Sequence, residues 1–254
     1  MKVFNRAFLV MVFVFGSLIL FSRPAKAAGE DGILPELKLE ADSTIDAYNK
    51  YVWRGFTLDT DPVVQPGFNI SGYGFTVSYW SSFDAQNDDT LNSAEVDLTI
   101  DYTYSTEYAD FSVGHTNYDF PGTKTYSKEW YVGIALNEVP LSPTLVYYHD
   151  YGKEENGGGH GDYVNLGISH SFTLIEASAI TLDLAASVGY NHELFILGDG
   201  GDYLMSAGLT IPLTKTSSVS PVFGYSVPFG DLKDANDGNQ KKRSFAGVSV
   251  AVSF

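Results

Sequence analysis

Acidic side chains lie on the polar face of three segments in which polar and apolar residues alternate, near 36–52, 92–104 and 180–190. Alternate residues of a β-strand point to the same side, so the carboxylates of each segment would share one face. Carboxylates along a water-filled passage raise the local concentration of cations and disfavour anions. The candidate lumen-lining residues are Glu40, Asp42, Asp46, Glu95, Asp97, Asp101 and Asp183.

Three basic residues share the polar face of the first of these segments, namely Lys38, Lys50 and Arg54. They could pair with the acids in a static network that fills a narrow interior. The same residues therefore allow two arrangements, an open acid-lined passage and a closed, salt-bridged interior. The sequence favours neither.

Residue patterns for covalent or metal chemistry are weak. The chain has no Cys, and its five His residues show neither an H-x-H nor an H-x-x-x-H spacing. His170 and Ser171 are adjacent, as are His149 and Asp150, and neighbours on a strand point to opposite faces. We therefore expect no metal site, no cofactor and no enzymatic activity.

The segments that carry these acids belong to a series of predicted strands, most of them about 9–11 residues long, the length that crosses a bilayer when tilted. In residues 180–190, for example, Leu182, Leu184 and Val188 oppose Asp183 and Ser187. The same period-2 pattern predicts twelve strands, near 36–52, 63–72, 74–83, 92–104, 108–117, 128–136, 144–151, 162–172, 180–190, 202–211, 219–227 and 244–254.

The connections between these segments alternate between short and long. Short ones follow the even-numbered strands, and longer polar ones follow the odd-numbered strands, including 53–62, 118–127 and 228–243. This arrangement is typical of a transmembrane up-and-down antiparallel β-barrel whose termini both lie in the periplasm. An even number of strands closes the barrel without an open edge. The rival fold is a soluble periplasmic β-sandwich, which also alternates.

The N-terminal residues have the features of a cleavable signal peptide. Lys2 and Arg6 precede an uncharged run over 7–21, and Ala25-Lys26-Ala27 forms an A-x-A site. We expect residues 1–27 to be removed, 28–35 to be a short periplasmic lead-in and 36–254 to form the barrel in the bacterial outer membrane. Cleavage removes four basic residues and no acidic ones, so the formal charge goes from −16 to −20. Such a chain would repel nucleic acid.

Two partners are expected from the ends of the strands. The last strand finishes at Phe254, and a terminal aromatic residue on an amphipathic strand resembles the signal that the outer-membrane assembly machinery reads. The acidic loops could be bridged by divalent cations to lipopolysaccharide phosphates, because hard cations accept oxygen clusters of many kinds.

One stretch carries a resemblance to a known family. Residues 48–56 read Tyr-Asn-Lys-Tyr-Val-Trp-Arg-Gly-Phe, and 79–84 read Tyr-Trp-Ser-Ser-Phe-Asp. This stretch resembles the TorF-type porins, exported bacterial proteins with a Tyr-aromatic-Arg-Gly signature early in the mature chain. The resemblance implies porin-like transport and gives weight to Trp53, Arg54, Gly55 and Trp80. By strand parity Arg54 and Trp80 both face inward, so we expect a cation–π contact between them, a lumen clasp.

The expected function is passive diffusion of ions or small hydrophilic solutes, with a preference for cations. The first alternative is a closed barrel whose acidic outer loops interact with other molecules. The second is an outer-membrane hydrolase, whose short His-x-Ser motifs the sequence lacks.

Overall fold

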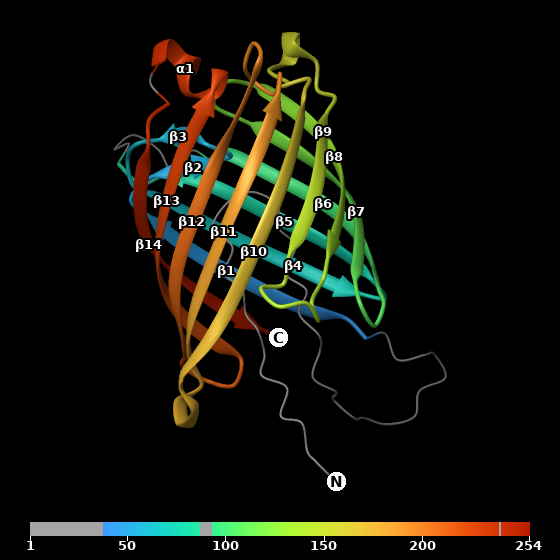
Figure 1. The fold of residues 1–254 in the computed structure, drawn as a ribbon, viewed down its shortest axis with the longest axis vertical. Helices are drawn as coiled ribbons and strands as arrows, with labels where there is room; N and C mark the ends of the chain where they lie inside the picture. The colour runs from blue at the N-terminus through green and yellow to red at the C-terminus, as the bar shows by residue number, and fades with distance from the viewer. Residues whose placement is uncertain (1–37, 87–92, 239) are drawn as a thin grey trace.

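The computed structural model describes residues 38–86, 93–238 and 240–254. These residues form a closed antiparallel barrel of twelve strands, in the order β1-β14-β13-β12-β11-β10-β9-β8-β7-β6-β5-β4 (Figure 1). The strands are β1 (Glu40–Tyr48), β4 (Val63–Gly72), β5 (Phe75–Asp84), β6 (Ser93–Ser105), β7 (Asp110–Phe120), β8 (Thr125–Ala135), β9 (Thr144–Asp150), β10 (Asp162–Ile175), β11 (Ile180–His192), β12 (Asp199–Pro212), β13 (Ser217–Gly230) and β14 (Arg243–Ser253). The predicted fold class and strand number are therefore confirmed.

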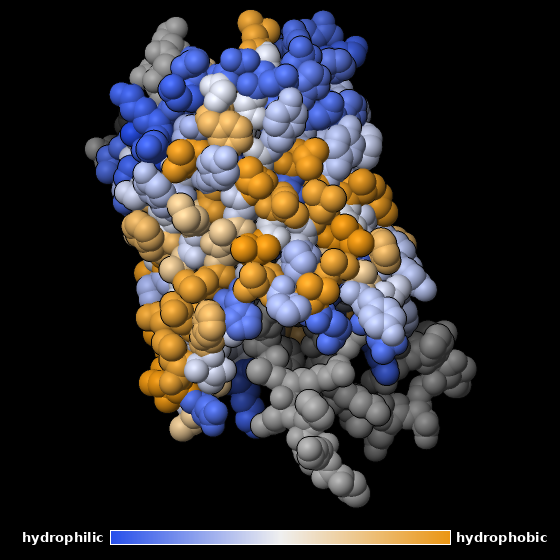
Figure 2. All heavy atoms as spheres, in the orientation of Figure 1, coloured by the Kyte–Doolittle hydropathy of each residue, from blue (hydrophilic) through white to orange (hydrophobic). Residues whose placement is uncertain are grey.

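The period-2 pattern divides each strand between two environments. Large apolar side chains such as Ile100, Ile168 and Phe223 lie on the outside and are about half exposed. The polar side chains of the same strands point into the barrel. Figure 2 shows hydrophobic side chains over the body of the barrel and hydrophilic ones gathered at one end. An apolar outer band between polar ends matches the environment of a bilayer.

The first predicted strand was wrong beyond Tyr48. β1 ends there, and the chain then forms a separate two-stranded sheet, β2 (Tyr51–Trp53) and β3 (Phe56–Asp59). Residues 53–62 were expected to be an outer loop. The structure instead folds this hairpin into the barrel, where Tyr51, Val52 and Phe56 are buried.

We call the end that holds residue 254 the terminal end and the opposite end the loop end (Figure 1). The predicted alternation of connection lengths holds in part. At the loop end, 121–124 is a four-residue turn rather than a long loop, and 231–242 contains the helix α1 (Asp231–Gly238). Short 3-10 helices lie at η1 (Glu154–Asn156) and η2 (Glu176–Ser178).

Among the residues placed in the structure, no helix is both long enough and apolar enough to cross a bilayer. The predicted signal peptide, 1–27, and the lead-in, 28–35, lie outside the described residues.

The interior has two levels. Near the loop end the hairpin and inward-facing aromatic residues form the buried cluster, which includes Trp53, Tyr148, Tyr163, Leu232 and Phe245. Near the terminal end the inward positions carry small side chains. These include Ser78, Thr99, Ser112, Gly133, Ser169, Ser206, Gly208, Thr210 and Ser220. We call the half of the interior nearest the loop end the upper level and the half nearest the terminal end the lower level. The upper level is packed by large side chains, and the lower level is lined by hydroxyls and carboxylates.

Candidate functional site

The hairpin formed by β2 and β3 places Arg54 inside the barrel. Arg54 and Gly55 are the two turn residues, with φ of 46° and 80°, and Trp53 pairs with Phe56 across them. Two consecutive positive φ angles are typical of the type I′ hairpin turn, which a glycine at the second position favours. A Cβ at Gly55 would lie 2.7 Å from a side-chain carbon of Leu232, so the close packing also requires glycine there.

Arg54 forms a buried, two-point ion pair with Glu129 of β8. Its Nη1 lies 2.6 Å from Oε2 and its Nη2 lies 3.0 Å from Oε1. The hydroxyl of Tyr118 donates a further hydrogen bond to Oε1 of Glu129 at 2.9 Å. Burial by itself lowers the pKa of Arg54, but the negative charge of Glu129 reverses this effect and the pKa is raised overall. The guanidinium is therefore charged and paired with Glu129 at two points.

Three aromatic rings surround the same guanidinium. Its Cζ lies 4.1 Å from the ring centre of Tyr148, 4.6 Å from that of Tyr163 and 4.5 Å from that of Trp53. A cation within about 6 Å of an aromatic face is attracted by the ring quadrupole, and more strongly where water is excluded. We call Glu129, Tyr118, Tyr148 and Tyr163 the Arg54 cage.

Aromatic packing extends from this site to the loops. Trp53 stacks on Phe56 and makes edge contacts with Tyr118 of β7 and Phe195 of the β11–β12 connection. Leu232 of α1 is fully buried against the hairpin. The hairpin is thus held by side chains of the barrel strands on one side and by side chains of the loops on the other. It narrows the loop end of the lumen.

The predicted lumen acids lie on the inward faces of their strands, at two levels. Glu95 and Asp97 of β6 lie near the hairpin, as does Asp46 of β1. Nearer the terminal end are Glu40, Asp42, Asp101 and Asp183. The inward direction follows from the outward, exposed positions of Ile45, Leu98, Ile100 and Leu184 in the same strands.

Three of these acids, Asp42, Asp101 and Asp183, accept hydrogen bonds from neutral donors rather than from cations. Asp42 accepts from the amide of Asn69 at 2.7 Å, and Asp101 accepts from the hydroxyl of Tyr131 at 2.8 Å. Asp97 has one buried carboxylate oxygen without a hydrogen-bond partner. In the described residues, Arg54 and Glu129 form an inward ion pair, whereas pairing of the predicted acids with Lys38 or Lys50 is not observed.

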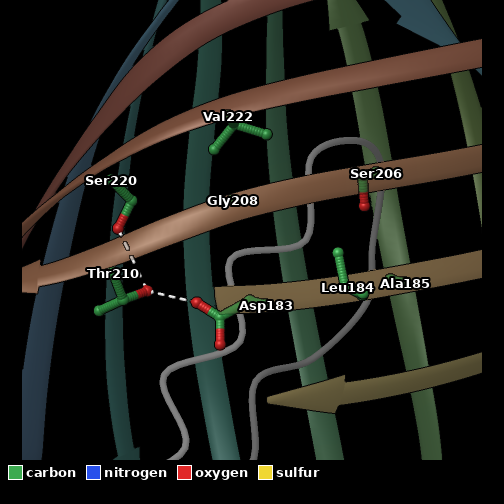
Figure 3. A pocket seen from close by; sticks show the side chains of 8 residues that line it. All are labelled: Asp183, Leu184, Ala185, Ser206, Gly208, Thr210, Ser220 and Val222. Carbon is green, nitrogen blue, oxygen red and sulfur yellow. Dashed lines mark hydrogen bonds between the residues drawn. The ribbon is translucent and has the colours of Figure 1, made fainter. Parts of the chain in front are cut away.

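Asp183 sits in a small hollow of the lower wall. Figure 3 shows Ser220, Thr210 and Asp183 in line across β13, β12 and β11, with Gly208 and Ala185 beside them. Thr210 donates to Asp183 at 2.7 Å, and Ser171 and Thr181 also donate to it. The hydroxyl donors hold the Asp183 carboxylate in place, and the residues beside it are small.

The expected clasp between Arg54 and Trp80 has a different geometry. Both residues lie inside, but Arg54 is stacked among Trp53, Tyr148 and Tyr163, and Trp80 packs on Tyr51 with ring centres 5.7 Å apart. The prediction assumed that β1 continued through Arg54. Only β4 would then separate Arg54 from Trp80 of β5. The hairpin instead carries it across the lumen to β8.

Sequence reasoning missed Glu129, Tyr148 and Tyr163. In 144–151 both faces carry aromatic and aliphatic residues, so the inward face could not be chosen from periodicity. The sequence nevertheless held one signal, a glycine at position 189 on the polar face of its strand. The structure explains it, because a Cβ there would lie 1.9 Å from the hydroxyl of Tyr163. A glycine on a polar strand face can mark the seat of a large ring from the next strand.

Comparisons with known proteins agree with this architecture. The sequence model of a bacterial protein family of unknown function, Gcw_chp, matches residues 39–223. The KdgM porin structure is 12% identical, with a TM-score of 0.54 over 85% of this chain and 99% of that chain, and a second KdgM structure contains disordered oligogalacturonate. The NanC porin is 9% identical, with a TM-score of 0.51 over 85% and 99%. No curated protein sequence matches the chain. At these identities the structural likenesses show the fold alone.

Proposed function

Because this chain belongs to the Gcw_chp family of bacterial proteins of unknown function, its function has to be inferred from its own geometry, and we propose a narrow porin-like channel. It would sit in the bacterial outer membrane and pass small hydrophilic solutes by diffusion, with a preference for cations.

The observation that carries this proposal is the contrast between the two faces of the barrel. The outside presents an apolar band, and the inside presents carboxylates that neutral donors hold. Acids outnumber the inward-facing bases Arg54 and Arg243 among the described residues. Because a low-dielectric wall strengthens the field of such charges, cations would be concentrated in the lumen and anions depleted.

The charge of the lumen also bears on the solute. Oligogalacturonate, present in one KdgM structure, is a polyanion. The inward acids of this chain would repel such a molecule, so the shared fold does not support transferring that solute. Cations and small neutral solutes fit the lower chamber, where Asp183 and the neighbouring hydroxyls offer hydrogen bonds.

The proposed location brings two partners. Phe254 is 77% exposed at the end of the last strand, which leaves its ring accessible to an assembly receptor. At the loop end, lipopolysaccharide would contact the outer rim. Export through a signal peptide over 1–27 is part of this proposal.

The experiment that tests the proposal is conductance of protein 28–254, refolded and inserted in a planar bilayer under a KCl gradient. Small discrete steps with a cation-selective reversal potential are expected. An anion-selective reversal potential would contradict the role given to the inward acids.

A second candidate function rests on the packed loop end. Trp53, Phe56 and Leu232 are buried near the loop end, and Phe195 packs on Trp53 from a loop, as a closed barrel with interacting loops would require. Absence of current from inserted protein, and also from a variant that lacks the hairpin, would favour this candidate over the channel.

A further inference from the structure

We propose that the Arg54 cage is a binding site for small guanidinium-type organic cations, which Arg54 occupies within the same chain. This inference rests on the proposed channel function and names the class of solute that would compete with the hairpin for its seat.

The cage belongs to the barrel, whereas its occupant belongs to the hairpin. Tyr118, Glu129, Tyr148 and Tyr163 come from four successive strands, β7 to β10. Two of them, Tyr148 and Tyr163, also make contacts that do not involve the hairpin. The hydroxyl of Tyr163 donates to Asp202 at 2.8 Å, and Tyr148 packs between Tyr131 and Tyr163. These two rings should therefore keep their places when Arg54 leaves, and Tyr118 still donates to Glu129 from the neighbouring strand.

The chemistry of the cage suits a flat, forked cation. Glu129 offers both carboxylate oxygens to the two terminal nitrogens of one guanidinium, and this two-point geometry is specific to that group. Tyr148 and Tyr163 present aromatic rings to the same charge. A neutral molecule of the same shape lacks the attraction, and an anion would meet the carboxylate.

The hairpin is separate from the hydrogen-bonded ladder of the barrel. β2 and β3 pair with each other in a separate two-stranded sheet, and such a sheet is only marginally stable on its own. Aromatic contacts of Trp53 hold the hairpin in addition to the ion pair of Arg54. A free cation would therefore compete with the Arg54 side chain for the cage, and substitution of Arg54 by a small residue would leave the cage open to it.

The test uses Arg54→Ala in 28–254, with methylguanidinium as the probe and urea as a flat, neutral control. We expect the variant to conduct more than the unmodified chain, and millimolar methylguanidinium to block this current while urea does not. Adding Glu129→Gln should weaken the block roughly tenfold or more, because it removes the charged acceptor. Lys153→Ala, which removes a charge from a side chain 75% exposed, is the matched control and should conduct like the unmodified chain.

The outcomes separate this inference from the channel itself. A conducting Arg54→Ala variant that methylguanidinium does not block overturns the cage but leaves the channel in place. If neither chain conducts, calorimetry on the folded variant decides the question. Heat of methylguanidinium binding that Glu129→Gln abolishes supports the cage, and no heat overturns it. If the variant refolds poorly, recovery of folding with methylguanidinium but not with urea supports the cage, and no recovery overturns it.

Discussion

At the scale of single residues, the pair of Arg54 and Glu129 governs the upper lumen. Both side chains are almost fully buried. Removing one partner leaves the other charge buried without compensation, which costs roughly 3–5 kcal/mol in comparable pairs. We therefore predict that Glu129→Gln lowers the free energy of unfolding by an amount in that range, measured by denaturant titration of the refolded protein.

The matched control for this change is Glu155→Gln, because Glu155 is exposed beside Lys153. It should alter the unfolding free energy by less than about 1 kcal/mol. A double variant of Arg54→Ala and Glu129→Gln should lose less than the sum of the two single losses. Strict additivity would show that the two side chains are not coupled.

A second prediction at this scale concerns the glycine beneath Tyr163. In Gly189→Ala the new Cβ would lie 1.9 Å from the Tyr163 hydroxyl, so the ring must leave the position in which it contacts Arg54. The conductance should rise as the hairpin loosens. In Gly208→Ala, on the next strand, the Cβ would have its nearest neighbours at 3.6 Å, an ordinary contact, and the conductance should stay unchanged. Equal conductance of the two variants would show that Tyr163 does not help to hold the hairpin in the lumen.

At the scale of elements, the strands were predictable from the sequence and the hairpin was not. β4 was expected at 63–72 and lies at Val63–Gly72, because alternation and a Gly-Tyr-Gly turn mark its end. The hairpin continues the alternation of β1, so periodicity could not separate the two. Its turn uses Arg54 at a positive φ, where Asn or Asp would have signalled a type I′ turn.

The helix α1 gives a prediction of its own. Leu232 is fully buried, with its side chain against Gly55 and its backbone against Gly200, whereas Lys233 is exposed. Leu232→Ala should release α1 from the hairpin, since truncation of a buried Leu costs about 2–5 kcal/mol. Limited proteolysis should then cut within 231–238 much faster than in Lys233→Ala. Similar cleavage rates in both variants would show that α1 does not rest on the hairpin.

At the scale of the whole molecule, the sequence predicts which face of each strand is polar but not what fills the interior. Inward acids such as Asp101 and Asp183 followed from parity. The separation into an aromatic upper level and a lower level lined by hydroxyls and carboxylates depends on where residues 51–59 fold, which is a long-range property. No local pattern links Arg54 to Glu129, which lies 75 positions further along the chain.

The lower level should set the charge selectivity. Glu40, Asp42 and Asp183 lie there, away from the hairpin. Changing them to Gln, Asn and Asn should shift the reversal potential under a KCl gradient toward zero, with little change in the conductance step. The shift should shrink at high salt, because screening shortens the reach of each carboxylate. An unchanged reversal potential would place the selectivity elsewhere.

The measurement that tests the central claim most directly compares conductance with and without the hairpin. Residues 50–60 would be replaced by a short Gly-Ser linker between β1 and β4, which are paired neighbours in the barrel. We predict that the linker variant folds as the same barrel, conducts in larger and longer-lived steps, and stays cation-selective. A folded, inserted variant with the same current as the unmodified chain would contradict a channel narrowed by this hairpin.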